Sequence, residues 1–336
     1  MLSFKEDEYK TSEKLIIEAR PIAEQVAEEI NKQGYSNIFF ASVGGSLAPM
    51  MVIGEIAKEI TDAPVYVEQA AELLIKGNKK LNKDSIVITL SKSGDTKESV
   101  AIANWCKEQG IRVVAITKKA ESNLAKAAKW HIPMRHENGV EFEYMLLFWL
   151  FFKLLHLRGD FADYPQFGQQ LEYLPKNLLE AKKQFDPKAE EIAQKYHKSN
   201  YMIWVGGAEM WGEVYLFSMC ILEEMQWLKT KAVSSAEFFH GTLELVDKDQ
   251  PLFLVKGEGK ARALDDRVER FAQKVTDNLV VIDTKQFSLN QIDDKFRWIL
   301  APTVCSTILV DRLAAHFEKC TGHSLDIRRY YRQFDY

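Results

Sequence analysis

The sequence has few cysteines and lacks the patterns that would give them a structural role. Its four cysteines in 336 residues are widely spaced, and no C-x-x-C pair occurs. This pattern does not support a disulfide framework or a zinc site. The motifs H-E-x-x-H, G-x-S-x-G and the Walker P-loop are missing, and the Val-Gly-Gly turns do not continue as G-x-G-x-x-G. The catalytic classes that these motifs mark are therefore unsupported, as is a Rossmann dinucleotide site.

Neither sign of charge is in large excess, and no apolar run is long. The net charge is −4 and the isoelectric point is near 6.1, which gives no electrostatic reason to expect nucleic acid or an acidic membrane as a partner. Residues 1–8 are acidic and lack the apolar region of a signal peptide. The longest apolar cluster, residues 145–152, is far shorter than the roughly 20 residues of a membrane span. We therefore expect a cytoplasmic protein.

Apolar strand patterns alternate with helical patterns along the first half of the chain. Buried strands that alternate with helices are typical of a parallel sheet covered on both faces. An amphipathic pattern predicts a helix that Gly34 ends. The predicted helices cover residues 12–33, about 46–61 and 96–109, and the predicted strands cover residues 38–43, 65–67, 85–90 and 112–116.

Three short matches, in the same order, indicate an internal duplication. Val-Gly-Gly-Ser at residues 43–46 recurs as Val-Gly-Gly-Ala at 205–208, after an apolar strand in both cases. Residues 70–74 resemble 235–239, and the apolar run 252–255 falls where the strand 85–90 would repeat. The sequence therefore predicts two α/β subdomains, which we place at residues 1–160 and 199–336. A helical bridge, residues 161–198, is expected between them.

Residues 91–96, Ser-Lys-Ser-Gly-Asp-Thr, place three hydroxyls and a glycine between a buried strand and a helix start. Backbone N–H groups at a helix N-terminus carry partial positive charge, and hydroxyls add neutral donors, so this hydroxyl loop suits a phosphate. The alternative is a polar turn in which Thr96 only caps its helix. In the second half the equivalent residues, 256–261, have no hydroxyl and include an acid, so only the first half keeps the phosphate pattern.

Glu224 and His240 are the candidate catalytic residues of the second half. On an α-helix Glu224 would share an apolar face with Phe217, Ile221 and Leu228. Burial there would raise the pKa of its carboxyl into the range of a general base. The alternative is a buried acid that pairs with Arg or Lys for structural reasons. His240 follows two aromatic residues and precedes a glycine, and its alternative role is that of a packed, hydrogen-bonded histidine.

The chain resembles the sugar isomerase (SIS) superfamily in a double arrangement, and over nearly its whole length it looks like the fructosamine-6-phosphate deglycases. The superfamily is marked by the turn at 44–46 and the hydroxyl loop at 91–96. The deglycase branch is marked by Glu-Met-Gln-Trp at 224–227, Glu-Phe-Phe-His-Gly at 237–241 and Arg-Arg-Tyr at 328–330. The resemblance implies two flavodoxin-like subdomains and a homodimer with active sites at the subunit interface.

The resemblance also implies roles for individual residues. Glu224 would be the general base and His240 would serve ring opening or proton donation, with no metal or organic cofactor. The residues implied to bind the sugar 6-phosphate are Gly45, Ser46, Ser91, Lys92, Ser93 and Thr96.

The expected reaction is cleavage of a 6-phosphofructosyl amino acid to glucose 6-phosphate and a free amino acid. The alternatives are an aldose–ketose phosphosugar isomerase and a phosphosugar sensor without catalytic activity. The resemblance also extends to the isomerase domain of glucosamine-6-phosphate synthase, whose C-terminal tail supplies a lysine to its site. The aromatic, basic tail of this chain contains no lysine, the last one being Lys319, and this weakens the interpretation as a synthase. Where the family usually has His-Gly-Pro, this chain has His-Gly-Thr at residues 240–242, which is a departure from the family pattern. The tail itself is expected to pack on its own domain.

Overall fold

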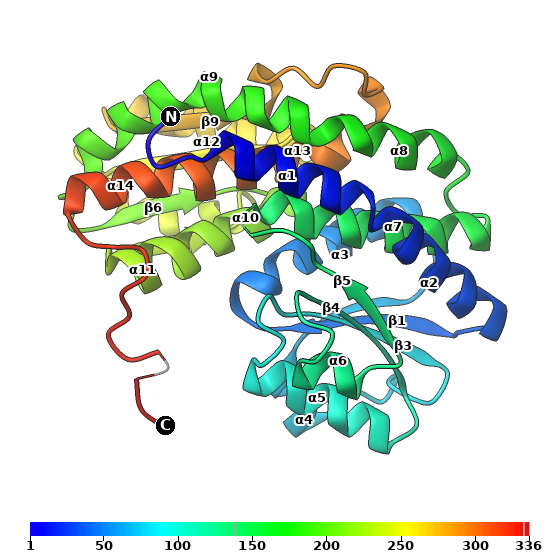
Figure 1. The fold of residues 1–336 in the computed structure, drawn as a ribbon. Helices are drawn as coiled ribbons and strands as arrows, with labels where there is room; N and C mark the ends of the chain where they lie inside the picture. The colour runs from blue at the N-terminus through cyan, green and yellow to red at the C-terminus, as the bar shows by residue number, and fades with distance from the viewer. Residues whose placement is uncertain (138, 332, 336) are drawn as a thin grey trace. The chain divides into compact units, whose positions relative to one another are not determined.

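Two parallel sheets, one in each half of the chain, organise the structure (Figure 1). The computed structural model describes residues 1–137, 139–331 and 333–335. The N-terminal unit comprises Lys5–Glu172, and the C-terminal unit comprises Tyr173–Tyr336 together with Met1–Phe4. The segment expected to be a bridge is helical: α8 (Tyr164–Gln170) belongs to the N-terminal unit and α9 (Leu174–Tyr196) belongs to the C-terminal unit.

The N-terminal sheet has five parallel strands in the order β2-β1-β3-β4-β5. The two central strands, β1 and β3, are buried along their whole length, which explains their continuous apolar sequences. Strand β3 has the predicted bounds, β1 and β4 differ from the prediction by a single residue at their ends, and β5 was not predicted. The strands are β1 (Asn37–Ser42), β2 (Val65–Gln69), β3 (Ser85–Leu90), β4 (Arg112–Thr117) and β5 (Trp130–Pro133).

The C-terminal sheet repeats the strand order of the first. Its four parallel strands are ordered β7-β6-β8-β9, which matches β2-β1-β3-β4 position by position. The shared order supports the duplication that the sequence matches indicated. The strands are β6 (Met202–Val205), β7 (Thr230–Val233), β8 (Leu252–Lys256) and β9 (Leu279–Asp283).

The helix predicted over residues 12–33 is wrong in one respect, because the structure has two helices there. The break falls before Pro21, which lies in the first turn of the second helix. Proline fits a first turn but removes a hydrogen bond from a helix interior. Gly34 ends the second helix with φ of 72°, as predicted. The helices of this unit besides α8 are α1 (Glu6–Ile17), α2 (Arg20–Gln33), α3 (Ala48–Ile60), α4 (Ala70–Lys76), α5 (Lys97–Glu108), α6 (Asn123–Ala127) and α7 (Val140–Arg158).

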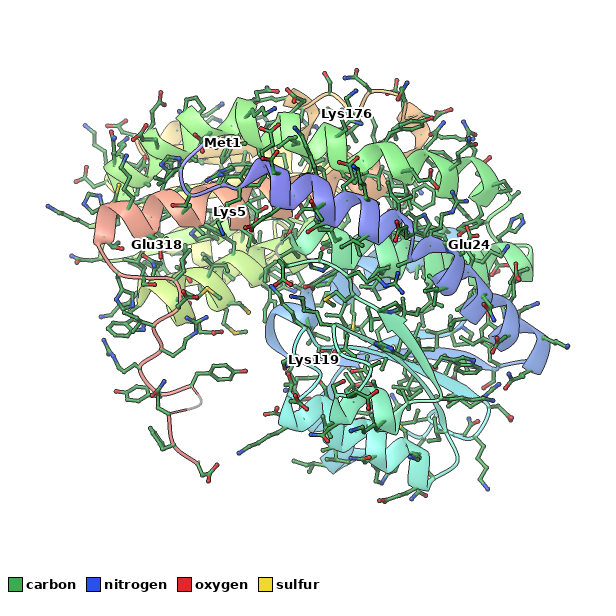
Figure 2. The ribbon with its side chains drawn as sticks, in the orientation of Figure 1. Met1, Lys5, Glu24, Lys119, Lys176 and Glu318 are labelled. Atoms are coloured by element: carbon green, nitrogen blue, oxygen red, sulfur yellow. The ribbon has the colours of Figure 1, made fainter. Side chains whose placement is uncertain are left out.

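Helix α7 carries the long aromatic cluster of the sequence and forms part of the N-terminal core. Residues 144–152 are buried on every side of the helix, as expected for a helix that is apolar all round. Phe151 packs edge-on against Phe40 of β1, with ring centroids 5.6 Å apart. Elsewhere in the unit, Glu24 on α2 (labelled in Figure 2) accepts hydrogen bonds from Arg20 and from the Tyr164 hydroxyl of α8.

The C-terminal unit contains two π-helical segments, Leu216–Glu223 and Leu309–Leu313. Its helical run 294–321 is long and apolar enough to cross a membrane, but 83% of that apolar window is buried inside the protein. Burial of this extent is typical of a core helix. The α-helices of the unit besides α9 are α10 (Trp211–Tyr215), α11 (Glu224–Gln226), α12 (Arg262–Val275), α13 (Arg297–Ile308) and α14 (Ala314–Thr321).

A buried ionic cluster joins α9 to the second π-helical segment. Asp186 Oδ1 lies 3.1 Å from Arg312 Nε and 3.1 Å from His316 Nε2. The Arg312 side chain is only 1% exposed and also donates a hydrogen bond to the carbonyl of Leu2. This bond holds the start of the chain against the C-terminal unit.

Candidate active site

The hydroxyl loop follows β3, where the strand order of the N-terminal sheet reverses. From β1 the chain moves to β2 at one edge, and from β3 it moves to β4 on the other side. The connections after β1 and β3 therefore diverge, and such a switch point is where open α/β sheets bind ligands. Ser42 Oγ at the end of β1 donates a 2.7 Å hydrogen bond to the carbonyl of Leu90 at the end of β3. The structure thus brings the glycine turn and the hydroxyl loop to the same edge.

The hydroxyl groups of the loop are organised by the loop itself. The hydroxyls of Ser91 and Thr96 hydrogen-bond to each other at 2.8 Å, and Ser91 Oγ also accepts from the N–H of Gly94 at 3.2 Å. Ser93 Oγ accepts from the N–H of Asp95. Thr96 occupies the N-cap position of α5, yet its side chain caps no N–H of the helix. The alternative of a simple capping threonine is therefore wrong, and α5 begins without a side-chain cap.

Gly94 is required for the shape of the loop. Its φ is +73°, and a Cβ at this position would lie 2.3 Å from Ser122 Oγ and 2.6 Å from Thr117 Oγ1. A side chain would therefore be strained by its backbone and would collide with neighbouring residues.

The remaining residues implied to bind phosphate lie beside this loop or within it. Gly45 and Ser46 belong to a half-buried 3₁₀ turn, Gly44–Ser46, directly before α3. Lys92 lies within the hydroxyl loop, and its side chain is exposed. The donors at this edge are thus hydroxyls, backbone N–H groups and the exposed Lys92, which together suit a phosphate.

A buried acid that sequence reasoning missed lies in the same unit. Glu143, in the first turn of α7, is only 8% exposed. Burial raises the pKa of Glu143 to about 7, although the positive charge of Lys92 opposes this shift. Because Lys92 belongs to the hydroxyl loop, Glu143 interacts electrostatically with that loop. The sequence gives no signal for this residue, because acids are common in the first turn of a helix and Glu141 lies in the same turn.

At the corresponding edge of the C-terminal sheet, the protein's own carboxylates take the place of an anion. Asp265 accepts hydrogen bonds from the N–H of Gly207 at 3.2 Å, from that of Gly257 at 3.4 Å and from Ser235 Oγ at 2.5 Å. Glu209 accepts from the N–H of Gly259 at 2.9 Å. Both acids are buried. The second switch point is therefore already filled.

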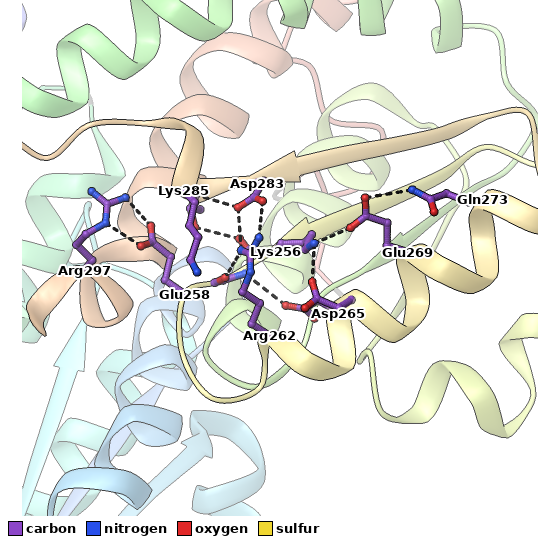
Figure 3. A network of polar contacts seen from close by, with 12 residues as sticks. Lys256, Glu258, Arg262, Asp265, Glu269, Gln273, Asp283, Lys285 and Arg297 are labelled. Carbon is purple, nitrogen blue, oxygen red and sulfur yellow. Dashed lines mark hydrogen bonds and ion pairs between the residues drawn. The ribbon is translucent and has the colours of Figure 1, made fainter. Parts of the chain in front are cut away.

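The loop after β8, residues 256–261, contains the acid Glu258, which the sequence also showed. Unlike Asp265 and Glu209, Glu258 pairs with an arginine. It forms a bidentate ion pair with Arg297, with both N···O distances at 2.8 Å. Figure 3 shows this pair beside the pair of Arg262 with Asp283 and that of Lys256 with Glu269. The loop after β8 is thus embedded in an ion-pair network and offers no hydroxyls.

Glu224 directly follows the first π-helical segment, Leu216–Glu223. The residues before Glu224 therefore do not repeat with the α-helical period that the sequence analysis assumed. The helix ends at Gln226, Trp227 takes a left-handed conformation with φ of 56°, and the N–H of Leu228 donates to the carbonyl of Leu222. Leu228 therefore lies outside the helix. The expected burial of Glu224 on an α-helical apolar face is wrong, because its side chain is 35% exposed. Local π-helical turns frequently occur at functional sites.

The carboxylate of Glu224 is paired with the C-terminal tail. Arg328 Nε donates a 2.6 Å hydrogen bond to Glu224 Oε1. The tail packs on its own unit, as expected: Trp227 contacts the ring of His323 at 4.1 Å, and the guanidinium of Arg329 lies 4.2 Å from the Trp227 ring centroid. Together, residues 223–224, 227–230 and 328–331 line an open pocket of about 530 Å³. The alternative for Glu224, an acid paired with Arg or Lys, thus agrees with the structure in the pairing but not in the burial; that the partner is Arg328 was not predicted.

His240 is the last residue of a 3₁₀ turn, Glu237–His240, in the C-terminal unit. The buried Phe238 anchors this turn through ring contacts with Phe239 and Phe271. His240 itself is exposed, so the alternative of a packed histidine is wrong. Glu224 and His240 thus belong to one unit, and the hydroxyl loop belongs to the other.

Metal ligands are not grouped in the part of the chain that the structure describes. Within these residues no group of three or more His, Cys, Asp or Glu side chains could hold a metal ion. All four cysteines are free. The candidate residues thus offer a carboxylate and an imidazole in the C-terminal unit, and hydroxyl and N–H donors in the N-terminal unit.

Comparison with known proteins identifies the class of this fold. Residues 32–152 match the SIS domain. A crystal structure from Bacillus subtilis, described as a candidate phosphosugar isomerase, is similar with a TM-score of 0.85 and 26% identity, covering 90% of this chain and 93% of that one. The predicted fold class is confirmed.

Two relatives are similar over nearly the whole chain. Fructosamine deglycase FrlB of Bacillus subtilis is 28% identical, over 92% of this chain and 95% of the relative. Fructoselysine 6-phosphate deglycase of Escherichia coli is 24% identical, over 95% of this chain and 92% of the relative. These relatives confirm the resemblance to the deglycases and the expectation of an enzyme of the SIS type.

Proposed function

We propose that this protein is a deglycase that cleaves 6-phosphofructosyl amino acids to glucose 6-phosphate and free amino acid. The observation that carries the proposal is the carboxylate of Glu224, which lines an open pocket in a chain whose other unit bears the hydroxyl loop. The similarity to two deglycases over nearly the whole chain supports it.

The substrate is an Amadori compound, with an amine on C1 and a carbonyl at C2 once the ring is open. In the proposed mechanism His240 assists ring opening. Glu224 takes one proton from C1 and returns a proton to C2, while the C2 oxygen gains the proton that the nitrogen loses. The C1–N bond thereby becomes an imine. Water adds to C1, the C1–N bond breaks, and the amino acid leaves with a proton on its nitrogen.

The hydroxyl loop holds the 6-phosphate during these steps. Hydrogen bonds to a charged group contribute roughly 1.5–3 kcal/mol each, so a few neutral donors suffice to bind it. A homodimer and a cytoplasmic location, which the resemblance and the composition indicate, remain predictions that accompany this proposal.

The test is a coupled assay with glucose-6-phosphate dehydrogenase across a panel of 6-phosphofructosyl amino acids. Glu224→Gln should reduce turnover by about 10²–10⁴-fold, the usual contribution of general acid–base catalysis at one position. The exposed Glu244→Gln serves as the matched control and should keep wild-type turnover. Near-wild-type turnover by Glu224→Gln would remove Glu224 from this role. An isomerase would instead interconvert phosphosugars that carry no amino acid, and a sensor would bind without turnover.

A further inference from the structure

The pocket beside Glu224 has a composition that the proton transfer alone does not explain. One side is formed by residues 223–224 and 227–230 and the other by residues 328–331 of the tail, all within the C-terminal unit. Trp227, Tyr330 and Tyr331 contribute aromatic surface. The proton-transfer steps need only the carboxylate, so the rest of this lining is available for recognition.

The charges of the pocket are unequally satisfied. Glu224 is paired with Arg328 at 2.6 Å, and Glu223 accepts a 2.5 Å hydrogen bond from Thr230 Oγ1. Lys229 and Arg329 also line the pocket, and no carboxylate among the described residues forms an ion pair with either. The pocket therefore presents two cations without an anionic partner.

Arg329 is oriented for planar recognition by its contact with Trp227. The guanidinium lies 4.2 Å from the Trp227 ring centroid, an arrangement in which the ring stabilises the cation. A guanidinium that lies over a ring keeps its N–H groups in its own plane, where they can donate to both oxygens of a carboxylate.

We propose that this pocket binds the carboxylate of the amino-acid part of the substrate through Arg329 and Lys229. The inference rests on the proposed function, because Glu224 acts at C1 and C1 is the carbon that bears the amino acid. The amino acid must therefore lie beside Glu224, whereas the phosphate is five carbons away on C6. Of the two anionic groups of the substrate, the carboxylate is thus the one that reaches this pocket.

The assignment makes the carboxylate a determinant of specificity. The aromatic side chains provide surface for the aliphatic part of the amino acid, and the two cations discriminate against amines that lack a carboxylate. A 6-phosphofructosyl adduct of a simple amine should therefore bind poorly, although its sugar and phosphate are identical.

The test uses two ligands that differ only in this group and that cannot react. They are the glycine and methylamine adducts of 1-deoxyglucitol 6-phosphate, in which an alcohol replaces the C2 carbonyl. Calorimetry should show that the wild-type protein binds the glycine adduct about 10–100-fold more tightly, as expected for charge-assisted hydrogen bonds. In Arg329→Gln and Lys229→Gln the affinity for the glycine adduct should fall toward that for the methylamine adduct. The affinity for the methylamine adduct should stay unchanged. Lys231→Gln, an exposed cation outside the pocket, should keep the wild-type ratio.

The outcomes separate this inference from the proposed function, since binding is measured without turnover. Equal wild-type affinity for the two adducts, or no binding of either, would overturn the inference. The inference would also be overturned if Arg329→Gln lowered the affinities for both adducts and for inorganic phosphate equally. Such a result would mean that the pocket holds the phosphate. A carboxylate-dependent affinity without glucose 6-phosphate formation from the fructosyl substrate would keep the inference and reject the deglycase.

Discussion

Arg328 Nε donates a 2.6 Å hydrogen bond to Glu224 Oε1, joining the C-terminal tail to the candidate base. The Arg328 side chain is only 16% exposed and also donates to the carbonyl of Ile327. The contact links the carboxylate of Glu224 directly to the tail.

Arg328→Gln should therefore release the tail and lower turnover. We expect a loss of about tenfold or more in kcat, because the base is no longer held in one position. Chymotrypsin should cleave after the tail tyrosines faster than in the wild type. Unchanged cleavage together with unchanged kcat would show that this contact neither anchors the tail nor positions Glu224.

The hydroxyl loop should contribute to binding of the phosphate only. Thr96→Val and Ser93→Ala each remove a donor, and each should raise KM for a 6-phosphorylated substrate about tenfold or more. The exposed Ser36→Ala is the control from the same unit. If inorganic phosphate inhibits the loop variants as strongly as it inhibits the wild type, the phosphate binds elsewhere.

His240 should matter only while a ring has to be opened. His240→Asn should reduce kcat/KM for the normal substrate by about 10²-fold, within the range for one acid–base group. A 5-deoxy analogue cannot close a furanose ring, so the variant and the wild type should process it at similar rates. An equal loss on both substrates would assign His240 to a later proton transfer instead.

Glu143 should make the protein less stable as the pH rises. Burial raises the pKa of this carboxyl from 4.5 to about 7 in the folded state, so between these values the folded state binds more protons than the unfolded state. The free energy of unfolding should then fall by about 3 kcal/mol across this window. Urea unfolding at pH 4.5 and at pH 8 should show this loss in the wild type and in the exposed control Glu108→Gln, but not in Glu143→Gln. A Glu143→Gln variant that keeps the full pH slope would contradict the assignment.

The buried cluster around Asp186 should be essential for stability. Asp186→Asn leaves Arg312 buried without its ion pair, which we expect to cost about 3–5 kcal/mol in the free energy of unfolding. The neighbouring acid Glu190 pairs with Lys319 at the exposed surface, so Glu190→Gln should unfold at the wild-type urea concentration. Equal midpoints for the two variants would mean that burial of the cluster is unimportant.

The sheet positions and the hydroxyl loop could be predicted because their signals are local. A continuous apolar strand, a glycine and a helix start are all visible within residues 85–109, and β3 and α5 appear there. The environment of Glu224 could not be predicted in the same way. A period of 3.6 residues was assumed, but the π-helical segment shifts the face, and the partner Arg328 lies 104 residues away in sequence.

The switch point of the C-terminal sheet could likewise be predicted only in part from the sequence. The loss of hydroxyls between 256 and 261 is visible in the sequence, and it correctly indicated that this loop differs from residues 91–96. That Asp265 and Glu209 fill the position depends on the folding of α12 and of the turn after β6 against one loop. Only tertiary structure brings these carboxylates to the glycine N–H groups.

The central claim, transfer of a proton from C1 by Glu224, is tested most directly with a substrate that carries two deuterons on C1. We expect NMR to show glucose 6-phosphate with only one deuteron left on C1, and turnover slowed several-fold by the isotope. A product that retains both deuterons on C1, such as fructose 6-phosphate released by direct cleavage of the C1–N bond, would contradict the account.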